Sequence, residues 1–395
     1  MAEQLTGRQA RRSFLALAAA AALSLALAGC QMVPKGKPAP APTPEAAPTP
    51  VPGTGLPTDI NRNRVAVLVP LTGPNAGVGK SISNAANLAL LDTGGEAVRI
   101  SVYDTGAGAA AAAQRAITEG NRLFLGPLLA EDVRAIAPIA KRAGVPVISF
   151  SNDVGVAGNG VYVMGFTPGQ SISRVVGYAR SQGLQRFAGL IPDGVYGRRA
   201  SQELIDAVEK AGGRMVAMQT YDRSPQALRA AVTRLNGQSG FDAILIADSG
   251  RIAISAAPMI RGSDSKDARI LGTELWKTEN SLSANAAIRG AWFASVPDAM
   301  FNQLRTRYRA RYGVSPYRLG SLGYDAVLLT VRIAKDWKVG RPFPESELRS
   351  SDGFAGVDGA FRFGSDGVAD RSLEVLQVGA NGFTTVSPAP RGFGQ

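Results

Sequence analysis

The amino-acid sequence predicts an α/β fold with two doubly wound parallel-sheet lobes and an inter-lobe cleft. Short apolar runs, typical of strands buried on both faces, alternate with longer stretches of helical periodicity. This alternation pauses after 145–150 and starts again at 168–182 with the same rhythm. The chain has 395 residues, 45% of them hydrophobic, so it contains enough apolar material for two such cores.

The first predicted lobe begins with the apolar run 65–71, followed by a helix near 81–91 with Ser83 or Asn84 as capping candidates. Three more strands and two more helices continue the pattern: strands 98–104, 122–128 and 145–150, and helices 107–119 and 131–143. Strands and helices that alternate in this way form a parallel sheet with helices on both faces.

The second predicted lobe has the same rhythm but no clear residue-level repeat of the first. Its strands are 186–193, 214–221, 241–248 and 268–275, and its helices are 168–182, 197–211, 224–236 and 252–261. The remaining elements are strand 290–296, long helices at 298–312 and 317–337, and short strands within 359–379. We assign 62–170 and 297–345 to the first lobe, and 171–296 and 346–390 to the second.

Residues 1–29 have the layout of a signal peptide. Arg8, Arg11 and Arg12 precede an apolar run, 14–28, that is short for a membrane span. The run ends in Leu-Ala-Gly-Cys, which resembles the bacterial lipobox, whose cysteine (here Cys30) is lipidated and anchors the protein to a membrane. The alternative is an ordinary signal or a short anchor with an incidental cysteine.

The residues around this motif predict the destination of the protein. Gln31 follows the cysteine, and this resembles lipoproteins sorted to the outer membrane, so we expect a periplasmic protein anchored there rather than to the inner membrane. The pair Arg11-Arg12 also resembles a twin-arginine signal, although Ala10 precedes it, and the export route stays open.

Residues 30–61 are predicted to be a spacer. Pro, Ala, Thr and Gly dominate this segment, which contains PAPAPTPEAAPTPVPGTG. Such a composition cannot bury a core and favours extended polyproline II. A globular region then begins near Arg62.

The composition excludes several classes of chemistry. Histidine is absent and Cys30 is the only cysteine, so Ser-His-Asp and Cys-His catalysis, imidazole or thiolate metal sites and a disulfide framework are excluded. The sequence also shows no activated nucleophile. We therefore expect no enzymatic activity, no cofactor and no metal.

The formal net charge of +12 raises the question of nucleic acid. The arginines are scattered, with a single cluster at 305–312 (RTRYRARY), and no aromatic-rich binding motif accompanies that cluster. We expect no nucleic-acid partner. An exported protein of this charge is better matched to anionic envelope material, such as glycan strands, or to an acidic protein.

The stretch 65–81, VAVLVPLTGPNAGVGKS, suggests a phosphate-binding P-loop. The pattern G-x-x-x-x-G-K-[ST] requires its first glycine at the position of Pro74, and proline has no N–H to give to a phosphate. Asp248 resembles a magnesium-binding Asp after an apolar strand, but Asp104 and Asp193 end apolar strands in the same way. We therefore interpret the stretch as a strand and a Gly-rich loop, with Lys80 and Ser81 beginning a helix.

Five stretches together resemble the type I periplasmic binding proteins of the leucine/isoleucine/valine-binding family. They follow one another in the family's order and span nearly all of 62–380: 65–90, 124–149, 161–179, 189–204 and 320–329. Within that family, exported lipoproteins with loops such as ILGTELW, 270–276, resemble penicillin-binding protein activators. The resemblance implies the two-lobed fold and one of two functions.

The first implied function is regulation of peptidoglycan synthesis through contact with a bifunctional penicillin-binding protein. The lipobox, Gln31 and the long spacer favour it. The second is substrate binding for an amino-acid ABC permease of the branched-chain type, or ligand sensing, with a small amino-acid-like ligand.

Ligands of open α/β sheets bind outside the carboxyl ends of the strands. This selects six loops: 72–79, 126–131, 149–153, 193–197, 248–251 and 272–276. The resemblance implies a hydroxyl for the ligand carboxylate in loop 126–131, which reads Gly-Pro-Leu-Leu-Ala-Glu and has none. A carboxylate left without hydrogen bonds in a closed cleft is costly, so amino-acid capture is disfavoured.

The remaining candidate ligand-binding residues follow from the same resemblance. Ser149, Ser151 and Asn152 could serve as hydroxyl and amide groups, Tyr196 matches the aromatic residue of an Asp-x-x-Tyr-Gly loop, and Glu274 corresponds to the acid that pairs with a ligand amine. The alternatives are structural: the serines as caps or loop hydroxyls, Tyr196 as a packing residue at the hinge, and Glu274 as a solvated side chain.

Overall fold

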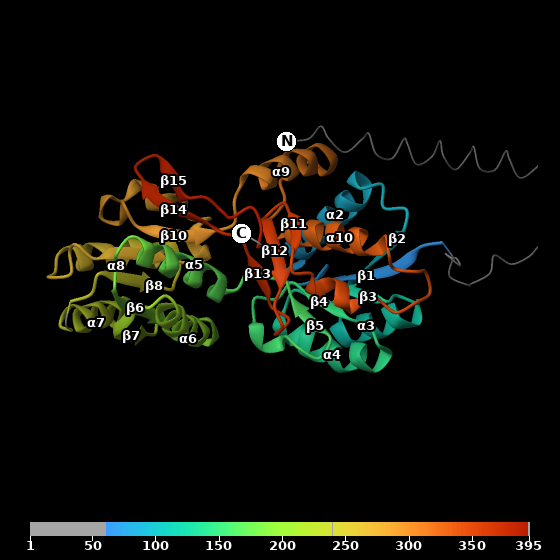
Figure 1. Cartoon of the computed structure of the whole chain (residues 1–395), viewed down its shortest axis with the longest axis horizontal. Coiled ribbons are helices and arrows are strands. Elements are labelled where there is room, and N and C mark those ends of the chain that lie inside the picture. The colour runs from blue at the N-terminus through green and yellow to red at the C-terminus, as the bar shows by residue number, and fades with distance from the viewer. Residues whose placement is uncertain (1–60, 239, 394–395) are drawn as a thin grey trace, which may run out of the picture. The chain divides into compact units, whose positions relative to one another are not determined.

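The first sheet has five parallel strands in the order β2-β1-β3-β4-β5 (Figure 1). The computed structural model describes residues 61–238 and 240–393, and all of these belong to one compact unit. The strands are β1 (Asn63–Val69), β2 (Val98–Asp104), β3 (Leu123–Leu125), β4 (Val147–Ser149) and β5 (Val161–Val163). The helices between them are α2 (Ala76–Asp92), α3 (Ala109–Thr118) and α4 (Ala130–Ala143).

The second sheet has seven strands in the order β15-β14-β10-β9-β8-β6-β7. Its five parallel strands are β6 (Arg186–Pro192), β7 (Arg214–Tyr221), β8 (Ala243–Ile246), β9 (Arg269–Gly272) and β10 (Trp292–Ser295). They repeat the neighbour order of the first sheet. Antiparallel strands β14 (Glu374–Gly379) and β15 (Gly382–Ser387) extend it beyond β10. The helices are α5 (Pro168–Ser181), α6 (Val195–Lys210), α7 (Pro225–Asn236) and α8 (Gly250–Arg261).

Each sheet lies between two hydrophobic clusters, one on each face, which together form the core of its lobe. Val65, Val67 and Val69 of β1 are fully buried in the first core, and Ile244 and Ile246 of β8 are fully buried in the second. The helices α9 (Ala299–Tyr312) and α10 (Gly320–Ala334) pack into the first core. The predicted fold class, two doubly wound parallel-sheet lobes, is confirmed.

The C-terminal region differs from the sequence assignment of 346–390 to the second lobe. A small sheet of β11 (Phe354–Gly356), β12 (Gly359–Phe363) and β13 (Ala369–Arg371) packs into the first core through buried aromatic side chains. Phe361, for example, is fully buried there and lies near Phe354 and Phe363. Only β14 and β15 join the second sheet. The alternating pattern of these short strands does not say which sheet they cover, and this is why the assignment was wrong.

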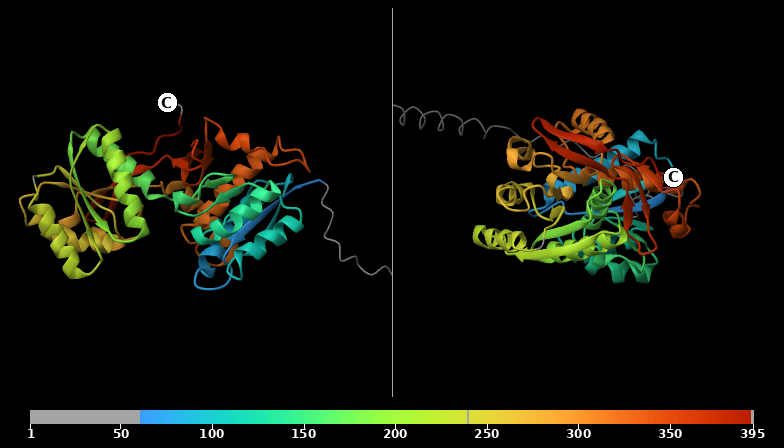
Figure 2. Two further views of the ribbon diagram at one scale, coloured as in Figure 1. Left: turned by 90° about the horizontal axis from the view of Figure 1, so that it is seen from below. Right: turned by 60° about the vertical axis from the view of Figure 1, so that its left-hand side comes forward.

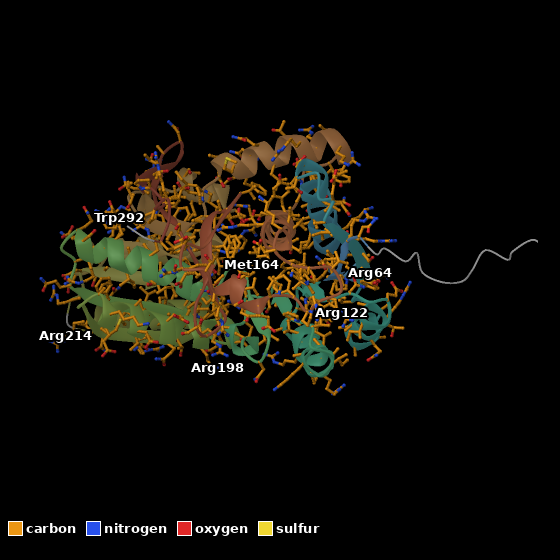
Figure 3. All side chains as sticks on the ribbon, turned by 45° about the vertical axis from the view of Figure 1, so that its right-hand side comes forward. Arg64, Arg122, Met164, Arg198, Arg214 and Trp292 are labelled. Atoms are coloured by element: carbon orange, nitrogen blue, oxygen red, sulfur yellow. The ribbon has the colours of Figure 1, made fainter. Side chains whose placement is uncertain are left out.

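The chain passes between the lobes at three places: between β5 and α5, between β10 and α9, and between β13 and β14. Figures 1 and 2 show these connections, and Met164, labelled in Figure 3, lies on the first of them. Met164 is fully buried, and its carbonyl oxygen accepts a hydrogen bond of 2.6 Å from buried Arg371. The connections are therefore part of the packed structure.

Several element boundaries differ from the prediction. Helix α2 begins at Ala76 rather than near Ser81, so Ser83 and Asn84 lie inside the helix and cap nothing. Strand β9 ends at Gly272, and a short 3-10 helix, η2 (Glu274–Trp276), follows it. Strands β5, β11, β13 and β15 were not predicted, because the first three have only three residues each and β15 contains only two large apolar residues.

The predicted signal peptide, Cys30 and the spacer up to residue 60 lie outside the described residues. Within the part of the chain that the structure describes, no helix combines the length and the apolar character needed to cross a membrane. The lipid anchor therefore stays a prediction from the sequence.

Candidate functional site

The carboxyl ends of the strands locate the candidate site. In the first sheet the strand order reverses between β1 and β3, and in the second between β6 and β8. The crevice at such a switch point is where doubly wound sheets bind ligands. Of the predicted site residues, Ser149 ends β4, and Ser151, Asn152, Tyr196 and Glu274 follow β4, β6 or β9, so the sheet topology places all five at the carboxyl ends of strands.

The loop after β1 is not a phosphate site. Gly79, Lys80 and Ser81 lie inside α2, and a Cβ atom on Gly79 would meet the carbonyl oxygen of Pro70 at 1.8 Å. The hydroxyl oxygen of Ser81 accepts a hydrogen bond of 2.9 Å from the Tyr317 N–H. Gly79 therefore allows the helix to approach the strand end closely, and Ser81 fixes the start of α10. The P-loop alternative is excluded by geometry as well as by Pro74.

Asp104 holds the same loop in place. Its carboxylate accepts hydrogen bonds from the Leu71 N–H at 2.7 Å and from the Thr72 hydroxyl at 2.8 Å. Desolvation raises its pKa, but these hydrogen bonds and one from the Gly106 N–H outweigh that effect and hold the pKa below its usual value. The Asp104 carboxylate therefore has a structural role, because its hydrogen bonds hold the loop after β1.

Ser149 and Ser151 are hydrogen-bonded to the backbone of their own loop and of the neighbouring loop. The Ser149 hydroxyl donates to the Pro127 carbonyl at 3.2 Å and accepts from the Ser151 N–H at 3.1 Å, and the side chain is fully buried. The Ser151 hydroxyl accepts from the Asp153 N–H at 3.1 Å. Asn152, between them, is exposed. None of the three borders the cavity described below, so the structure does not bring these residues together as a ligand-binding wall.

Tyr196 and Glu274, by contrast, are brought into contact. The Tyr196 hydroxyl lies 3.1 Å from Oε1 of Glu274 and 3.1 Å from Oγ1 of Thr273. The Ser171 hydroxyl donates to the other carboxylate oxygen of Glu274. Tyr196 stands in the first turn of α6, Glu274 follows β9 and Ser171 lies in the first turns of α5. We call these four residues the Glu274 cluster.

The surroundings of the Glu274 cluster raise the pKa values of Glu274 and Tyr196. Burial raises the pKa of Glu274, and the hydrogen bonds from Ser171 and Tyr196 oppose this only in part. Burial, followed by the charge of Glu274, raises the pKa of Tyr196 well above its usual value. The phenol is therefore a permanent hydrogen-bond donor, and the carboxylate is its acceptor.

The Glu274 cluster lies at the edge of a cavity of about 220 Å³. Both lobes contribute to its walls, which are Phe166, Thr167, Gln170, Ser171, Glu274, Leu275, Lys277, Thr278, Ser295, Val296, Arg318, Leu319 and Leu373. This volume is below the roughly 300–1,000 Å³ of typical small-molecule sites. The cavity can accept only a small group.

The cations that border this cavity already have partners. Lys277 forms ion pairs with Asp298 at 2.8 Å and Glu374 at 3.5 Å. Arg318 is ion-paired with fully buried Asp358, and its guanidinium lies 3.9 Å from the centroid of the Phe301 ring. A ligand carboxylate would therefore have to displace a protein carboxylate.

Asp358 belongs to a buried group of charges that the sequence analysis missed. Asp325 in α10 is fully buried and accepts a hydrogen bond from the Val357 N–H at 2.7 Å, and burial with the nearby charge of Asp358 raises its pKa. Arg371 lies in the same group and donates to the Met164 carbonyl of the crossover. These residues are far apart in sequence, so no local pattern could have indicated them.

Two members of the Glu274 cluster were also missed, and only one of them had a signal in the sequence. Ser171 is 103 residues from its partner Glu274, and its position in an ordinary amphipathic helix gives no signal. Thr273 could have been selected, because it directly precedes Glu274 at a strand end. Asp248, considered and set aside as a magnesium ligand, accepts hydrogen bonds from Tyr221 at 2.6 Å and Arg223 at 2.9 Å.

Comparison with known proteins gives one extensive family match. A family described as periplasmic binding protein matches residues 63–383. Among curated proteins, an uncharacterised protein from Rickettsia prowazekii is 24% identical over 177 residues, which cover 44% of this chain and 47% of that protein. The alignment thus spans about half the length of that relative.

Solved structures of two kinds are similar. A putative branched-chain amino acid ABC transporter protein from Rhodospirillum rubrum is 21% identical with a TM-score of 0.72, over 82% of this chain and 100% of that one. The C-domain of LpoA from Haemophilus influenzae, described as a regulator of PBP1A, is 17% identical with a TM-score of 0.66, over 82% and 100%. Identities this low show a shared fold and do not choose between the two functions.

Proposed function

The chain belongs to the periplasmic binding protein family, and on that premise we propose that it acts through protein contact rather than by capturing an amino acid. The proposed activity is regulation of peptidoglycan synthesis, in the manner of a penicillin-binding protein activator. The proposed location is the periplasmic face of the outer membrane, with Cys30 as the lipid anchor. No catalytic step, cofactor or metal is part of the proposal.

One observation carries it. Ser149 and Ser151, the predicted hydroxyl ligands of the first lobe, are hydrogen-bonded to the backbone of their own loop and of the neighbouring loop, and they do not border the cavity. The cavity cations Lys277 and Arg318 are paired with protein carboxylates. The carboxylate of an amino acid entering the cavity would have to compete with protein carboxylates for these cations, and desolvating a carboxylate without a cation partner is strongly unfavourable.

The test is glycan polymerisation by a purified bifunctional penicillin-binding protein, with and without the full chain in detergent. The proposal expects a higher polymerisation rate with the protein present. Ser149→Ala is expected to leave this stimulation unchanged, because the hydroxyl only supports its loop. A rate that does not respond to the protein, together with failure to co-purify with the synthase, would refute the proposal.

The Glu274 cluster favours a second candidate, substrate binding for an amino-acid ABC permease. Glu274 and Tyr196, from separate loops, meet at the edge of the cavity, and a carboxylate with two hydrogen bonds keeps lone pairs free for an ammonium group. A ligand that binds the folded state raises the melting temperature. A screen of amino acids that raised it in the wild type and not in Glu274→Gln would favour this candidate.

A further inference from the structure

Helix α9 has one buried face, which fixes it on the first lobe. Phe301, Leu304 and Tyr308 are buried in the first core. The Tyr308 hydroxyl accepts from the Asn84 side chain at 3.0 Å, and the Tyr312 hydroxyl donates to the Asn84 carbonyl at 2.9 Å. Helix α9 therefore lies beside α2, as Figure 1 shows, and its other faces are held toward solvent.

Those other faces are strongly basic. Residues 299–317 contain four exposed arginines at 305, 307, 309 and 311, and no Asp or Glu. Arg307 pairs with Asp92 at 3.1 Å, on the flank of the helix that it shares with Arg311. Arg305 and Arg309 stand one turn apart on the opposite flank, and no carboxylate within 61–238 and 240–393 pairs with either.

Arg305 and Arg309 border a hollow of about 440 Å³ on the surface. Thr306, Ala310 and Ser315 complete its lining, so the hollow offers two guanidinium groups and two hydroxyl groups and no negative charge. Beside it, the turn after the helix exposes Val314 and Tyr317 by 60% and 56%. Basic, hydroxyl and exposed apolar groups thus adjoin one another.

Complementing the helix dipole does not account for this arrangement. Arginines near the carboxyl end of a helix are stabilised by the dipole, and this applies to Arg309 and Arg311 in the last turn. Arg305 lies a full turn earlier, and the dipole gives no reason for a hollow between two unpaired guanidinium groups or for an exposed tyrosine next to it.

We propose that this surface docks an acidic segment of a partner protein. We call it the α9 face: Arg305, Thr306, Arg309, Ser315 and Tyr317. Guanidinium groups bind carboxylates through paired hydrogen bonds, and arginine with tyrosine is the combination enriched at protein interfaces. The exposed Tyr317 and Val314 favour a protein over a purely anionic glycan or lipid surface. That the partner is a peptidoglycan synthase rests on the proposed function.

Binding of a fluorescein-labelled decaglutamate peptide to the full chain in detergent, followed by fluorescence anisotropy, tests the α9 face. The double variant Arg305→Glu/Arg309→Glu is expected to weaken binding at least tenfold, because two attractions become repulsions. The matched control is Arg214→Glu/Arg229→Glu, the same charge change at exposed positions of the second lobe, and it is expected to stay within twofold of the wild type. Figure 3 labels Arg214 in that lobe.

A second variant separates geometry from charge. Arg305→Lys/Arg309→Lys keeps both charges but not the paired hydrogen bonds, so intermediate binding is expected. Equal losses in the α9 and control variants would mean that only net charge matters, and would overturn the inference. So would absence of binding in the wild type, or tighter binding of heparin or of phosphatidylglycerol vesicles than of the peptide.

The polymerisation assay distinguishes failure of this inference from failure of the proposed function. Stimulation of the synthase that persists in Arg305→Glu/Arg309→Glu would overturn the α9 face as its docking surface and leave the function standing. If the peptide bound through the two arginines but the wild type did not stimulate polymerisation by the synthase, the docking surface would be supported and the synthase would be excluded as its partner.

Discussion

Both lobes build their first strand–helix joint in the same way. In the first lobe, a Cβ atom on Gly79 of α2 would lie 1.8 Å from the carbonyl oxygen of Pro70, which follows β1. In the second lobe, a Cβ atom on Gly197 of α6 would lie 1.6 Å from the carbonyl oxygen of Pro192, which ends β6. The lobes differ in what they place beyond the joint. The first lobe turns its strand-end hydroxyls inward to its backbone, whereas the second turns Tyr196 toward Glu274.

This comparison indicates that the two lobes share a scaffold but differ in the polar groups that they place at the cavity. The second lobe places a polar cluster at the edge of the cavity, whereas the predicted hydroxyl residues of the first lobe, Ser149 and Ser151, do not border it. A two-lobed protein that captures an amino acid needs ligand-binding groups from both lobes. A protein that only presents its surfaces to a partner needs the scaffold, and the shared joints maintain that scaffold.

The largest expected difference between the lobes concerns buried charge. Asp358→Ala in the first lobe is expected to lower the free energy of unfolding by about 3–5 kcal/mol, because it removes the fully buried ion-pair partner of Arg318, whose side chain is only 19% exposed. Asp248→Ala in the second is expected to lower it by about 1–3 kcal/mol, because its partner Arg223 is 51% exposed and can be solvated. Urea denaturation measures both, and equal losses would contradict this contrast.

The shared joint predicts equal effects in the two lobes. Gly79→Ala and Gly197→Ala should each lower the free energy of unfolding by roughly 2–4 kcal/mol, since the new methyl group collides with backbone. Gly177→Ala in α5 is the matched control, because its Cβ would meet nothing within 4 Å, and it should be neutral or stabilising by about 0.5–1 kcal/mol. Thermal unfolding checks all three. A harmless substitution at either joint would show that the joints are not equivalent.

The Glu274 cluster predicts a pH dependence specific to the second lobe. Burial raises the pKa of Glu274 from 4.5. At pH values between the unfolded and the folded pKa, the folded state therefore holds a proton that the unfolded state has lost. The contribution of this residue to stability is therefore greatest below pH 4.5 and decreases as the pH rises through its folded pKa. In unfolding measured against pH, Glu274→Gln should remove this decrease relative to the wild type. Parallel curves for the two proteins would contradict the prediction.

The smallest expected effect lies in the first lobe. Ser149→Ala removes the hydrogen bonds to Pro127 and Ser151 and should lower the free energy of unfolding by about 1 kcal/mol. Ser151→Ala should do less, since its hydroxyl accepts a single loop N–H. Denaturant melts of both variants check the order. A larger loss for Ser151 would mean that it has a role outside the loop.

The sequence was sufficient for the fold because strands buried on both faces leave continuous apolar runs. Strands 98–104 and 214–221 were predicted to the residue, since their runs have clear ends. The start of α2 was misplaced because Ala-Gly-Val-Gly has low helix propensity, and close packing of Gly79 on Pro70 overrides that preference. The placement of β11–β13 depends on contacts with α10 and could not be predicted locally.

For the site, the sequence indicated residue types but not their partners. The loops that contain Tyr196 and Glu274 could be selected because each follows a predicted strand of the same sheet, and the family resemblance selected the two residues within them. Ser149 was selected for the same reason, yet its side chain turns to the backbone of the neighbouring loop, and only the three-dimensional path of Pro127 determines that. Ser171 and Asp358 depend on contacts across the whole chain.

Isothermal titration of the full chain with leucine, isoleucine and valine distinguishes action through protein contact from amino-acid capture. We expect no saturable heat, because Ser149 and Ser151 do not border the cavity and its cations are paired with protein carboxylates. Micromolar binding that disappears in Tyr196→Phe, with the fold intact by circular dichroism, would contradict it and identify the cleft as an amino-acid site.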